Sequence, residues 1–306
     1  MALARPLAGI VPPLLTPLLD RDTLDAAGLE RLVEHVLAGG ASGLFLLGTT
    51  GEGPSLSHRL RRDLVSRACA QVDGRASVLV GVTDTAFVET VDLARHAARA
   101  GADALVIAPP YYMPQGQPEL REYLGHLLSE LPLPLFLYNM PPLTKVPFEL
   151  ETVRWALDQD GVSGLKDSSG DMAFFSRIVA LARGRPDWPV LVGPEELLGP
   201  SVLAGGHGGV PGGANLFPRL YVALHRAARD GDLERTRDLQ ERVSRVGERL
   251  YGFGRHPSAT IKGIKCAAAC LGLASDFMAE PFHRFREAER HQVEAALEEL
   301  GPIVEV

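Results

Sequence analysis

The chain has 306 residues with 46% hydrophobic and 23% charged side chains, a composition that indicates a globular protein with a large buried core. The formal net charge is −7 and no basic cluster occurs, which argues against nucleic acid as a partner but allows an anionic substrate in a locally positive pocket. No apolar run approaches the roughly 20 residues that cross a membrane, so we expect no membrane partner.

Eight short apolar runs follow one another along the first two thirds of the chain. They are continuous rather than alternating, which is typical of parallel strands that are covered on both faces. We expect strands to begin at these residues: Gly9, Gly43, Ser77, Ala104, Pro134, Val162, Pro189 and Gly208.

The segments between these runs have the spacing of amphipathic helices. Leu60, Leu64 and Ala68 lie on one stripe, and Ser57 precedes them as a candidate N-cap. Eight alternating strand and helix units predict an α/β protein, a (β/α)8 TIM barrel over residues 1–231. An open, doubly wound parallel sheet is the alternative architecture.

After Pro218 the strand signals stop and the sequence is helical. Gly301-Pro302 is expected to close the last of four helices, which are Arg219–Arg229, Leu233–Leu250, Ser258–Leu271 and Phe282–Leu300. The first of them completes the barrel. No low-complexity linker follows, so we expect the other three to form a helical extension, residues 232–306, that packs on the barrel.

The amino terminus and the cysteines favour a cytoplasmic location. Prolines interrupt the apolar stretch at the start of the chain, which therefore lacks the pattern of a signal peptide. The three cysteines are too few for a disulfide framework and are expected to be small core residues in a reducing compartment: Cys69, Cys266 and Cys270.

Lys166 closes one of the apolar runs, and it is one of only four lysines in a chain whose positive charge is mostly arginine. A lysine can lose its proton when it is desolvated, whereas an arginine cannot. A neutral amine at this position could attack a carbonyl carbon and form a Schiff base. The alternative is an ion pair with an acid such as the neighbouring Asp167, in which the lysine would stay charged.

Polar side chains follow other strands at the end where TIM barrels have their active sites. Tyr138 ends the strand before that of Lys166, where its phenol could relay protons or simply fill the rim. Tyr111 and Tyr112 follow a double proline and could equally anchor a subunit interface.

The second strand ends in Gly48-Thr49-Thr50-Gly51. The threonine hydroxyls and the backbone N–H groups could hold a substrate carboxylate, and Gly48 would allow its close approach, although a tight turn would use the same residues. The glycine-rich stretch 205–213 fits no phosphate-binding motif and is expected to leave room in the barrel mouth. The histidines show no metal-ligand spacing at strand ends, so we expect no metal.

Four motifs occur in a fixed order: GTTGE at 48–52, PPYY at 109–112, YNMP at 138–141 and GLKDSSG at 164–170. Together they make the chain similar, over nearly its whole length, to the dihydrodipicolinate synthase/N-acetylneuraminate lyase family. The resemblance implies a TIM barrel, class I aldolase or lyase chemistry without a cofactor, and a homo-oligomer, either a tetramer or a dimer.

The resemblance also implies roles for individual residues. Lys166 matches the Schiff-base lysine and Tyr138 the proton-relaying tyrosine. Thr49 matches a threonine that links two tyrosines, and Tyr112 matches a tyrosine that is donated across a subunit interface. The remaining matches are a carboxylate-binding position and two backbone positions that line the pocket: Thr50, Gly193 and Val210.

The chain departs from the family at positions that bear on its substrate. The lysine-pathway synthases carry an arginine where Leu143 stands here. His58 matches the allosteric lysine site, but Arg61 and Thr85 replace its usual histidine and asparagine, so we do not expect feedback inhibition by lysine. The stretch 51–57 looks like that of the 2-keto-3-deoxy sugar acid aldolases.

We therefore expect a Schiff-base lyase that acts on pyruvate or a 2-oxo acid such as a 2-keto-3-deoxy sugar acid. Three alternatives stay open, because fold-level likeness does not assign a substrate. They are a 4-hydroxy-tetrahydrodipicolinate synthase that condenses pyruvate with aspartate semialdehyde, a sugar-acid dehydratase that uses the same lysine, and a silent sensor that binds a 2-oxo acid.

Overall fold

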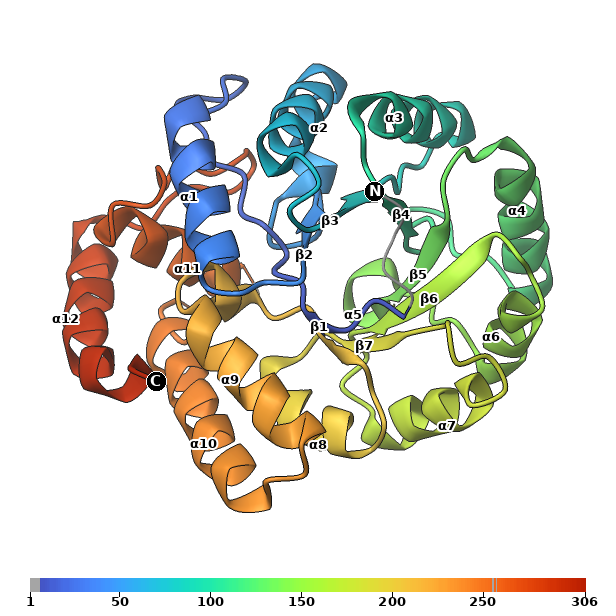
Figure 1. The fold of residues 1–306 in the computed structure, drawn as a ribbon. Helices are drawn as coiled ribbons and strands as arrows, with labels where there is room; N and C mark the ends of the chain where they lie inside the picture. Colours follow the sequence, from blue (N-terminus) through green and yellow to red (C-terminus); the bar gives the residue numbers. More distant parts are fainter. Residues whose placement is uncertain (1–5, 255, 257) are drawn as a thin grey trace.

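A computed structural model describes residues 6–254, 256 and 258–306, and it places eight parallel strands at the centre of a circle of helices (Figure 1). The strands are β1 (Gly9–Ile10), β2 (Gly43–Leu46), β3 (Ser77–Gly81), β4 (Ala104–Ile107), β5 (Leu135–Asn139), β6 (Val162–Asp167), β7 (Val190–Val192) and β8 (Gly208–Gly209). Six of them begin at the expected residue. β5 and β7 begin one residue later, because the expected first residue is a proline, which has no N–H to donate to a neighbouring strand.

The strands form a barrel rather than an open sheet. Their hydrogen-bonded order runs from β1 through β8 and down to β2. A parallel bridge between Pro13 and Phe45 joins the two ends of this order, and the Leu14 N–H donates to the Phe45 carbonyl at 2.9 Å. The predicted TIM barrel is therefore confirmed.

The surrounding helices are α1 (Ala26–Ala38), α2 (His58–Val72), α3 (Phe87–Ala100), α4 (Gln117–Glu130), α5 (Pro141–Thr144), α6 (Leu150–Leu157), α7 (Met172–Ala182), α8 (Leu198–Leu203), α9 (Pro218–Arg229), α10 (Leu233–Leu250), α11 (Ala259–Cys270) and α12 (Glu287–Val304). Ser57 is the N-cap of α2, as expected, since its hydroxyl accepts a hydrogen bond from the Leu60 N–H at 3.1 Å.

Apolar side chains fill two spaces, one on each face of the strands. The larger space lies between the barrel and the helices and continues into α10–α12. The smaller space is the inside of the barrel, which is filled by aromatic and aliphatic side chains that include Phe45, Phe136, Tyr138 and Val210. Burial on both faces explains why the strand sequences are continuous apolar runs.

The pairing of β5 with β6 contains a bulge. Leu135 lies opposite Val162, whereas the next residue, Phe136, lies opposite Gly164, so Ser163 is an extra residue on β6. A Cβ atom at Gly164 would come within 2.4 Å of the Phe136 ring, and a glycine is therefore required there. After the bulge the register is regular up to the carboxyl ends of both strands.

Helices α10, α11 and α12 follow the barrel. Figure 1 shows α10 beside α9, and α11 contacts the short turn after β8, Gly212–Asn215. α10 has the bounds expected from the sequence, and α11 differs from them by one residue at each end. The division of the chain into domains at residue 231 stays a prediction.

The last helix differs from the prediction at its start. The structure begins α12 at Glu287, whereas the sequence pattern placed the start at Phe282. The Arg286 N–H donates to the Glu289 carboxylate at 3.1 Å, which caps the first turn at this later position. The residues before it are irregular and bury Phe285, which the sequence pattern could not separate from a helical stripe.

The prediction was also wrong at the end of α12, which continues through Pro302 to Val304. Leu300 is fully buried, and Ile303 and Val304 pack against the core. This packing holds the last turn in spite of the proline, which removes one backbone hydrogen bond. Among the helices of the described residues, none combines the length and the hydropathy that a membrane crossing requires.

Candidate active site

Lys166 and Tyr138 lie next to each other at the carboxyl ends of β6 and β5, where their Cα atoms are register partners. Both side chains are buried inside the barrel, with Lys166 only 6% exposed. The Lys166 Nζ atom lies 4.1 Å from the centre of the Tyr138 ring and 5.0 Å from the centre of the Phe45 ring. The amine is thus surrounded by the faces of aromatic rings.

Asp167 does not pair with Lys166. Successive residues of a strand point to opposite faces, so the Asp167 side chain points away from that of Lys166. It accepts hydrogen bonds from the Asn139 amide at 2.8 Å and from the Ser169 hydroxyl at 2.9 Å. No salt bridge joins Lys166 to a carboxylate among the residues that the structure describes, so the ion-paired alternative is not supported.

Burial is the main cause of the pKa shifts of Lys166 and Asp167. Loss of solvent around Lys166 lowers the pKa of its amine, and the nearby Tyr138 hydroxyl only partly opposes that change. Burial also raises the pKa of Asp167, against the hydrogen bonds from Asn139 and Ser169. Contact with aromatic faces stabilises an ammonium far less than water does. Burial therefore shifts the equilibrium of Lys166 towards its uncharged, nucleophilic form.

The segment after β2, residues 47–52, is called here the threonine loop. Its two ends have left-handed backbone, with φ of 60° at Leu47 and 58° at Glu52. Such angles cost about 1–3 kcal/mol at non-glycine residues and persist only when the surroundings hold them. Between them, the Thr49 hydroxyl lies 3.2 Å from the Tyr138 hydroxyl, which brings two of the predicted site residues into one hydrogen bond.

A buried ion pair holds the end of the threonine loop. Glu52 Oε1 lies 2.5 Å from Lys265 Nζ, and both side chains are fully buried. The other carboxylate oxygen accepts a hydrogen bond from the Ala279 N–H at 2.7 Å. Sequence reasoning missed this pair. The available signal was the position of Lys265 within an apolar segment, 263–269, which indicates a buried side chain that requires a partner.

The ends of β7 and β8 complete the rim near these residues. The Gly193 N–H donates to the Asp167 carbonyl at 2.7 Å, and a Cβ atom at Gly193 would clash with Ser168 Oγ. Val210 is 4% exposed and belongs to the same inner cluster as Tyr138. Thr50 faces the turn after β8, since its hydroxyl lies 3.7 Å from the Cβ position of Gly212. These predicted residues therefore converge on one end of the barrel.

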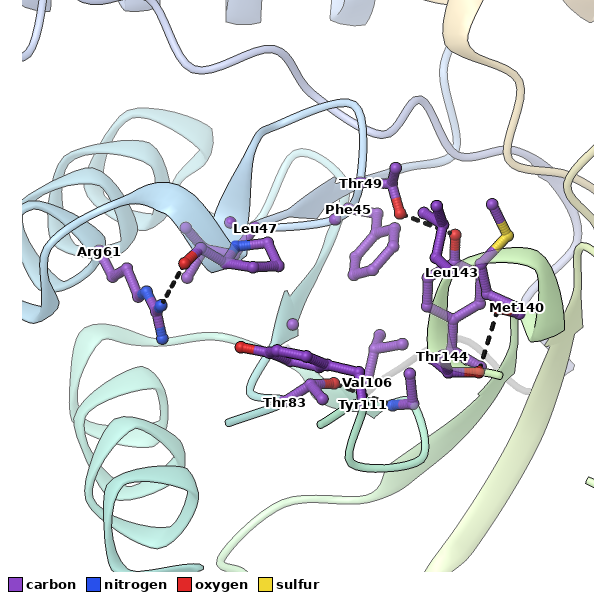
Figure 2. Close-up of a pocket in the computed structure, with 16 residues that line it drawn as sticks. Phe45, Leu47, Thr49, Arg61, Thr83, Val106, Tyr111, Met140, Leu143 and Thr144 are labelled. Carbon is purple, nitrogen blue, oxygen red and sulfur yellow. Dashed lines mark hydrogen bonds between the residues drawn. The ribbon is translucent and has the colours of Figure 1, made fainter. Parts of the chain in front are cut away.

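A cavity of about 190 Å³ opens beside the rim (Figure 2). Thr49, Tyr138 and Gly48 line it together with Tyr111 and Leu143. Lys166 does not line the cavity itself. Its amine lies against the rings of Phe45 and Tyr138, and both of these residues line the cavity.

The structure does not bring Tyr112 to the site of its own chain. Its side chain is 82% exposed, whereas the neighbouring Tyr111 turns into the cavity. A large aromatic side chain directed to solvent beside an active site is a typical subunit contact.

Arg61 lines the far side of the cavity and is almost fully buried. Its guanidinium donates to the carbonyls of Leu56 at 3.0 Å and Pro54 at 3.2 Å, and to the Asp84 carboxylate at 2.9 Å. Arg61 thus shapes the wall of the cavity with donors that are already engaged. No group of three or more His, Cys, Asp or Glu side chains in the described part of the chain is arranged to hold a metal ion.

Comparison with known proteins assigns the chain to a family. A model described as "Dihydrodipicolinate synthetase family" matches residues 6–300. The chain belongs to this family. Relatives that match the chain are named synthases, aldolases and lyases, and this protein is accordingly an enzyme of the class I aldolase type.

Three relatives illustrate the likeness to the dihydrodipicolinate synthetase family. The structure of dihydrodipicolinate synthase from Bacteroides thetaiotaomicron is 51% identical, covers 97% of this chain and 100% of its own, and has a TM-score of 0.95. A prophage protein of the family from Escherichia coli, solved in complex with pyruvate, is 29% identical over 98% and 99% of the two chains, with a TM-score of 0.91. The third relative, also from Escherichia coli, is named probable 2-dehydro-3-deoxy-D-pentonate aldolase and is 32% identical over 87% of this chain and 88% of its own.

Proposed function

We propose that the enzyme is a lyase that binds pyruvate, or the pyruvyl end of a larger 2-oxo acid, as a Schiff base on Lys166. The observation that carries this proposal is a buried amine that has no carboxylate partner among the described residues and lies beside the Tyr138 ring, whose hydroxyl is 3.2 Å from that of Thr49. The pyruvate complex of the Escherichia coli relative supports the choice of ligand.

The geometry supports a stepwise reaction. The Lys166 amine adds to the keto carbon, and Tyr138 donates its hydroxyl proton to the departing water, which leaves an iminium ion and a Tyr138 phenolate. When the bond between the third and fourth carbons breaks, its electron pair moves onto the iminium as an enamine, and the fourth carbon leaves as an aldehyde. Tyr138 accepts the hydroxyl proton of that carbon and later returns a proton to the enamine. Water then releases pyruvate and restores the lysine, without any cofactor.

The other site residues bind and orient the substrate. Thr49 holds the Tyr138 hydroxyl, and the Thr49 and Thr50 hydroxyls receive the pyruvyl carboxylate. Gly48, Gly193 and Val210 provide backbone surfaces around the bound acid. This arrangement fixes the keto carbon near the amine, which converts a bimolecular attack into an intramolecular one.

We propose a 2-keto-3-deoxy sugar acid as the substrate, in line with the name of the pentonate aldolase relative. Leu143 lines the cavity at the position where the lysine-pathway synthases carry an arginine, so an aliphatic side chain stands where a cation would bind a second carboxylate. The second candidate is 4-hydroxy-tetrahydrodipicolinate synthase, a name that other relatives carry, and the Bacteroides relative is named dihydrodipicolinate synthase. A sugar-acid dehydratase would use the same iminium but would release water without cleaving carbon.

We also propose that the enzyme is a cytoplasmic homo-oligomer, a dimer or tetramer. The exposed Tyr112 side chain supports this, because it could reach the Thr49 hydroxyl of a partner subunit and extend the chain of hydroxyls from Tyr138. Sedimentation would give the number of subunits, and a Tyr112→Ala variant that keeps both the assembly and full activity would contradict the shared site.

Reduction with borohydride in the presence of pyruvate tests the central proposal. The mass of a reduced pyruvyl adduct should appear on the peptide that contains Lys166. An adduct on Lys145 instead, or no adduct at all, would refute the proposal. Tight pyruvate binding without an adduct would indicate a silent sensor.

A panel of 2-keto-3-deoxy acids and aspartate semialdehyde, assayed for pyruvate release or consumption, separates aldolase from synthase. Loss of water without an aldehyde product identifies a dehydratase.

A further inference from the structure

The threonine loop depends on contacts from a distant part of the chain. The left-handed backbone at Leu47 and Glu52 is not favoured by the residues themselves. At Glu52 both carboxylate oxygens are held by groups that follow the barrel, Lys265 Nζ at 2.5 Å and the Ala279 N–H at 2.7 Å. The Glu52 end of the loop is therefore held by helix α11 and by the segment between α11 and α12.

Short contacts connect this anchor with the proposed chemistry. The Glu52 N–H donates to the Thr49 carbonyl at 3.0 Å, and the Thr49 hydroxyl lies 3.2 Å from that of Tyr138. The Tyr138 ring in turn lies 4.1 Å from Lys166 Nζ. Movement of Glu52 would carry Thr49 away from Tyr138, although Lys265 itself touches none of the reacting groups.

A second buried carboxylate connects the opposite side of the rim to the same helices. Glu195, after β7, accepts a hydrogen bond from the Gly213 N–H at 2.6 Å and one from the Tyr251 hydroxyl at 2.9 Å, just after α10. The two anchored segments meet at Gly212. A Cβ atom there would lie 3.3 Å from Glu195 Oε1 and 3.7 Å from the Thr50 hydroxyl.

We infer that Lys265 is a positioning residue, which acts through Glu52 to place Thr49 and Thr50 for catalysis. Helices α10 and α11 are then part of the active-site assembly rather than a cover for the barrel. The inference rests on the proposed function, since Thr49 and Thr50 have their catalytic and binding roles there. It adds a residue that lies outside the four sequence motifs and belongs to another region of the chain.

A pair of matched variants on helix α11 tests the inference. Lys265→Met removes the ion pair, whereas Lys262→Met makes the same change at a half-buried lysine one turn earlier. The rate of borohydride trapping is measured across pyruvate concentrations. We expect Lys265→Met to lower the maximal rate about 10- to 100-fold with a smaller change in the half-saturating concentration, and Lys262→Met to match the native protein.

Amide hydrogen exchange over residues 47–56 provides a readout that does not depend on activity. It should accelerate in Lys265→Met and stay native in Lys262→Met, with unchanged far-ultraviolet circular dichroism in both. The double variant Glu52→Gln/Lys265→Met removes both buried charges and replaces the single variant if that one fails to fold. It should recover stability while its trapping rate stays low, because the anchor is still missing.

The outcomes separate this inference from the proposed function. A folded Lys265→Met or double variant with native maximal trapping and native exchange over 47–56 overturns the positioning role. Full recovery of trapping in the double variant also overturns it, because the single variant would then have lost only stability. A native protein that forms no adduct refutes the proposed function. Even if the native protein forms no adduct, faster exchange over residues 47–56 in Lys265→Met would support the anchoring of the threonine loop by Lys265.

Discussion

Two lysines are buried in this protein, and their surroundings differ. Lys166 lies inside the barrel against the rings of Tyr138 and Phe45. Lys265 lies between the threonine loop and helix α11, with its ammonium 2.5 Å from the Glu52 carboxylate. Both side chains have lost nearly all contact with solvent, and burial lowers the pKa of each amine.

Burial alone therefore does not make a lysine a nucleophile. A carboxylate at hydrogen-bond distance from Lys265 opposes the effect of desolvation on its pKa and stabilises the charged form of its amine. Among the described residues, Lys166 has the Tyr138 hydroxyl and aromatic faces beside it but no carboxylate, so burial shifts its equilibrium towards the neutral form with less opposition. This difference supports the proposals that Lys166 reacts with the substrate and that Lys265 has a structural role.

The largest expected effect separates the two lysines by activity. Lys166→Met should reduce turnover at least about 10³-fold, because no other group in the site can form the iminium. Mass analysis after borohydride treatment should find no adduct, and Lys265→Met, although slower, should still form one. Substantial turnover in folded Lys166→Met would remove the contrast between the two residues.

For the free energy of unfolding, the larger loss is expected in Lys265→Met rather than in Lys166→Met. Lys265→Met leaves Glu52 buried without its partner and should lower the free energy of unfolding by about 3–5 kcal/mol. Lys166→Met replaces a buried amine that has no ionic partner with an apolar side chain of similar length, and should leave stability equal or higher. Urea unfolding of both variants measures the difference. Equal losses would mean that Lys166 has an ionic partner as well.

Tyr138→Phe keeps the aromatic face next to Lys166 but removes the hydroxyl. Turnover should fall about 10²-fold, as expected for the loss of a proton-transfer group, with little change in pyruvate affinity. Tyr123→Phe, on helix α4, is the matched control. An unchanged rate in Tyr138→Phe would leave Lys166 as the catalytic residue and assign the tyrosine to packing.

The smallest effect is a difference in pH dependence. Because the pKa of Lys166 is below its ordinary value of 10.5 in the folded state, the unfolded chain binds the extra proton over the interval between the two values. The free energy of unfolding should therefore rise with pH across that interval, by at most about 1.4 kcal/mol per pH unit, relative to Lys166→Met. The trapping rate should rise with pH and level off below 10.5. If the free energy of unfolding depends on pH in the same way in the native protein and in Lys166→Met, then the pKa of Lys166 is not shifted by folding.

Much of the fold and of the site could be predicted because the signals are local. Continuous apolar runs and short turns place eight strands within one residue of their observed starts. The strand-end position of Lys166 and Tyr138 follows from that pattern, since parallel strands of a barrel end at one rim. The motifs around them then indicate the family, which the comparisons confirm.

Other features escaped prediction because they depend on distant parts of the chain. The partner of Glu52 is 213 positions away, and sequence spacing does not indicate which buried acid meets which buried lysine. The extra residue at Ser163 is visible only in the pairing of β6 with β5. The end of α12 was misplaced because tertiary packing of Leu300 and Val304 overrides the local preference of Pro302.

The long separation between Glu52 and Lys265 also has a consequence for biosynthesis. A ribosome makes the chain from its amino end, so all eight strands have emerged before residue 265 is added. A nascent barrel can close at that stage, but the threonine loop still lacks its cationic partner. Competence to react with a keto acid should therefore arise late in translation, once α11 has left the exit tunnel and docked.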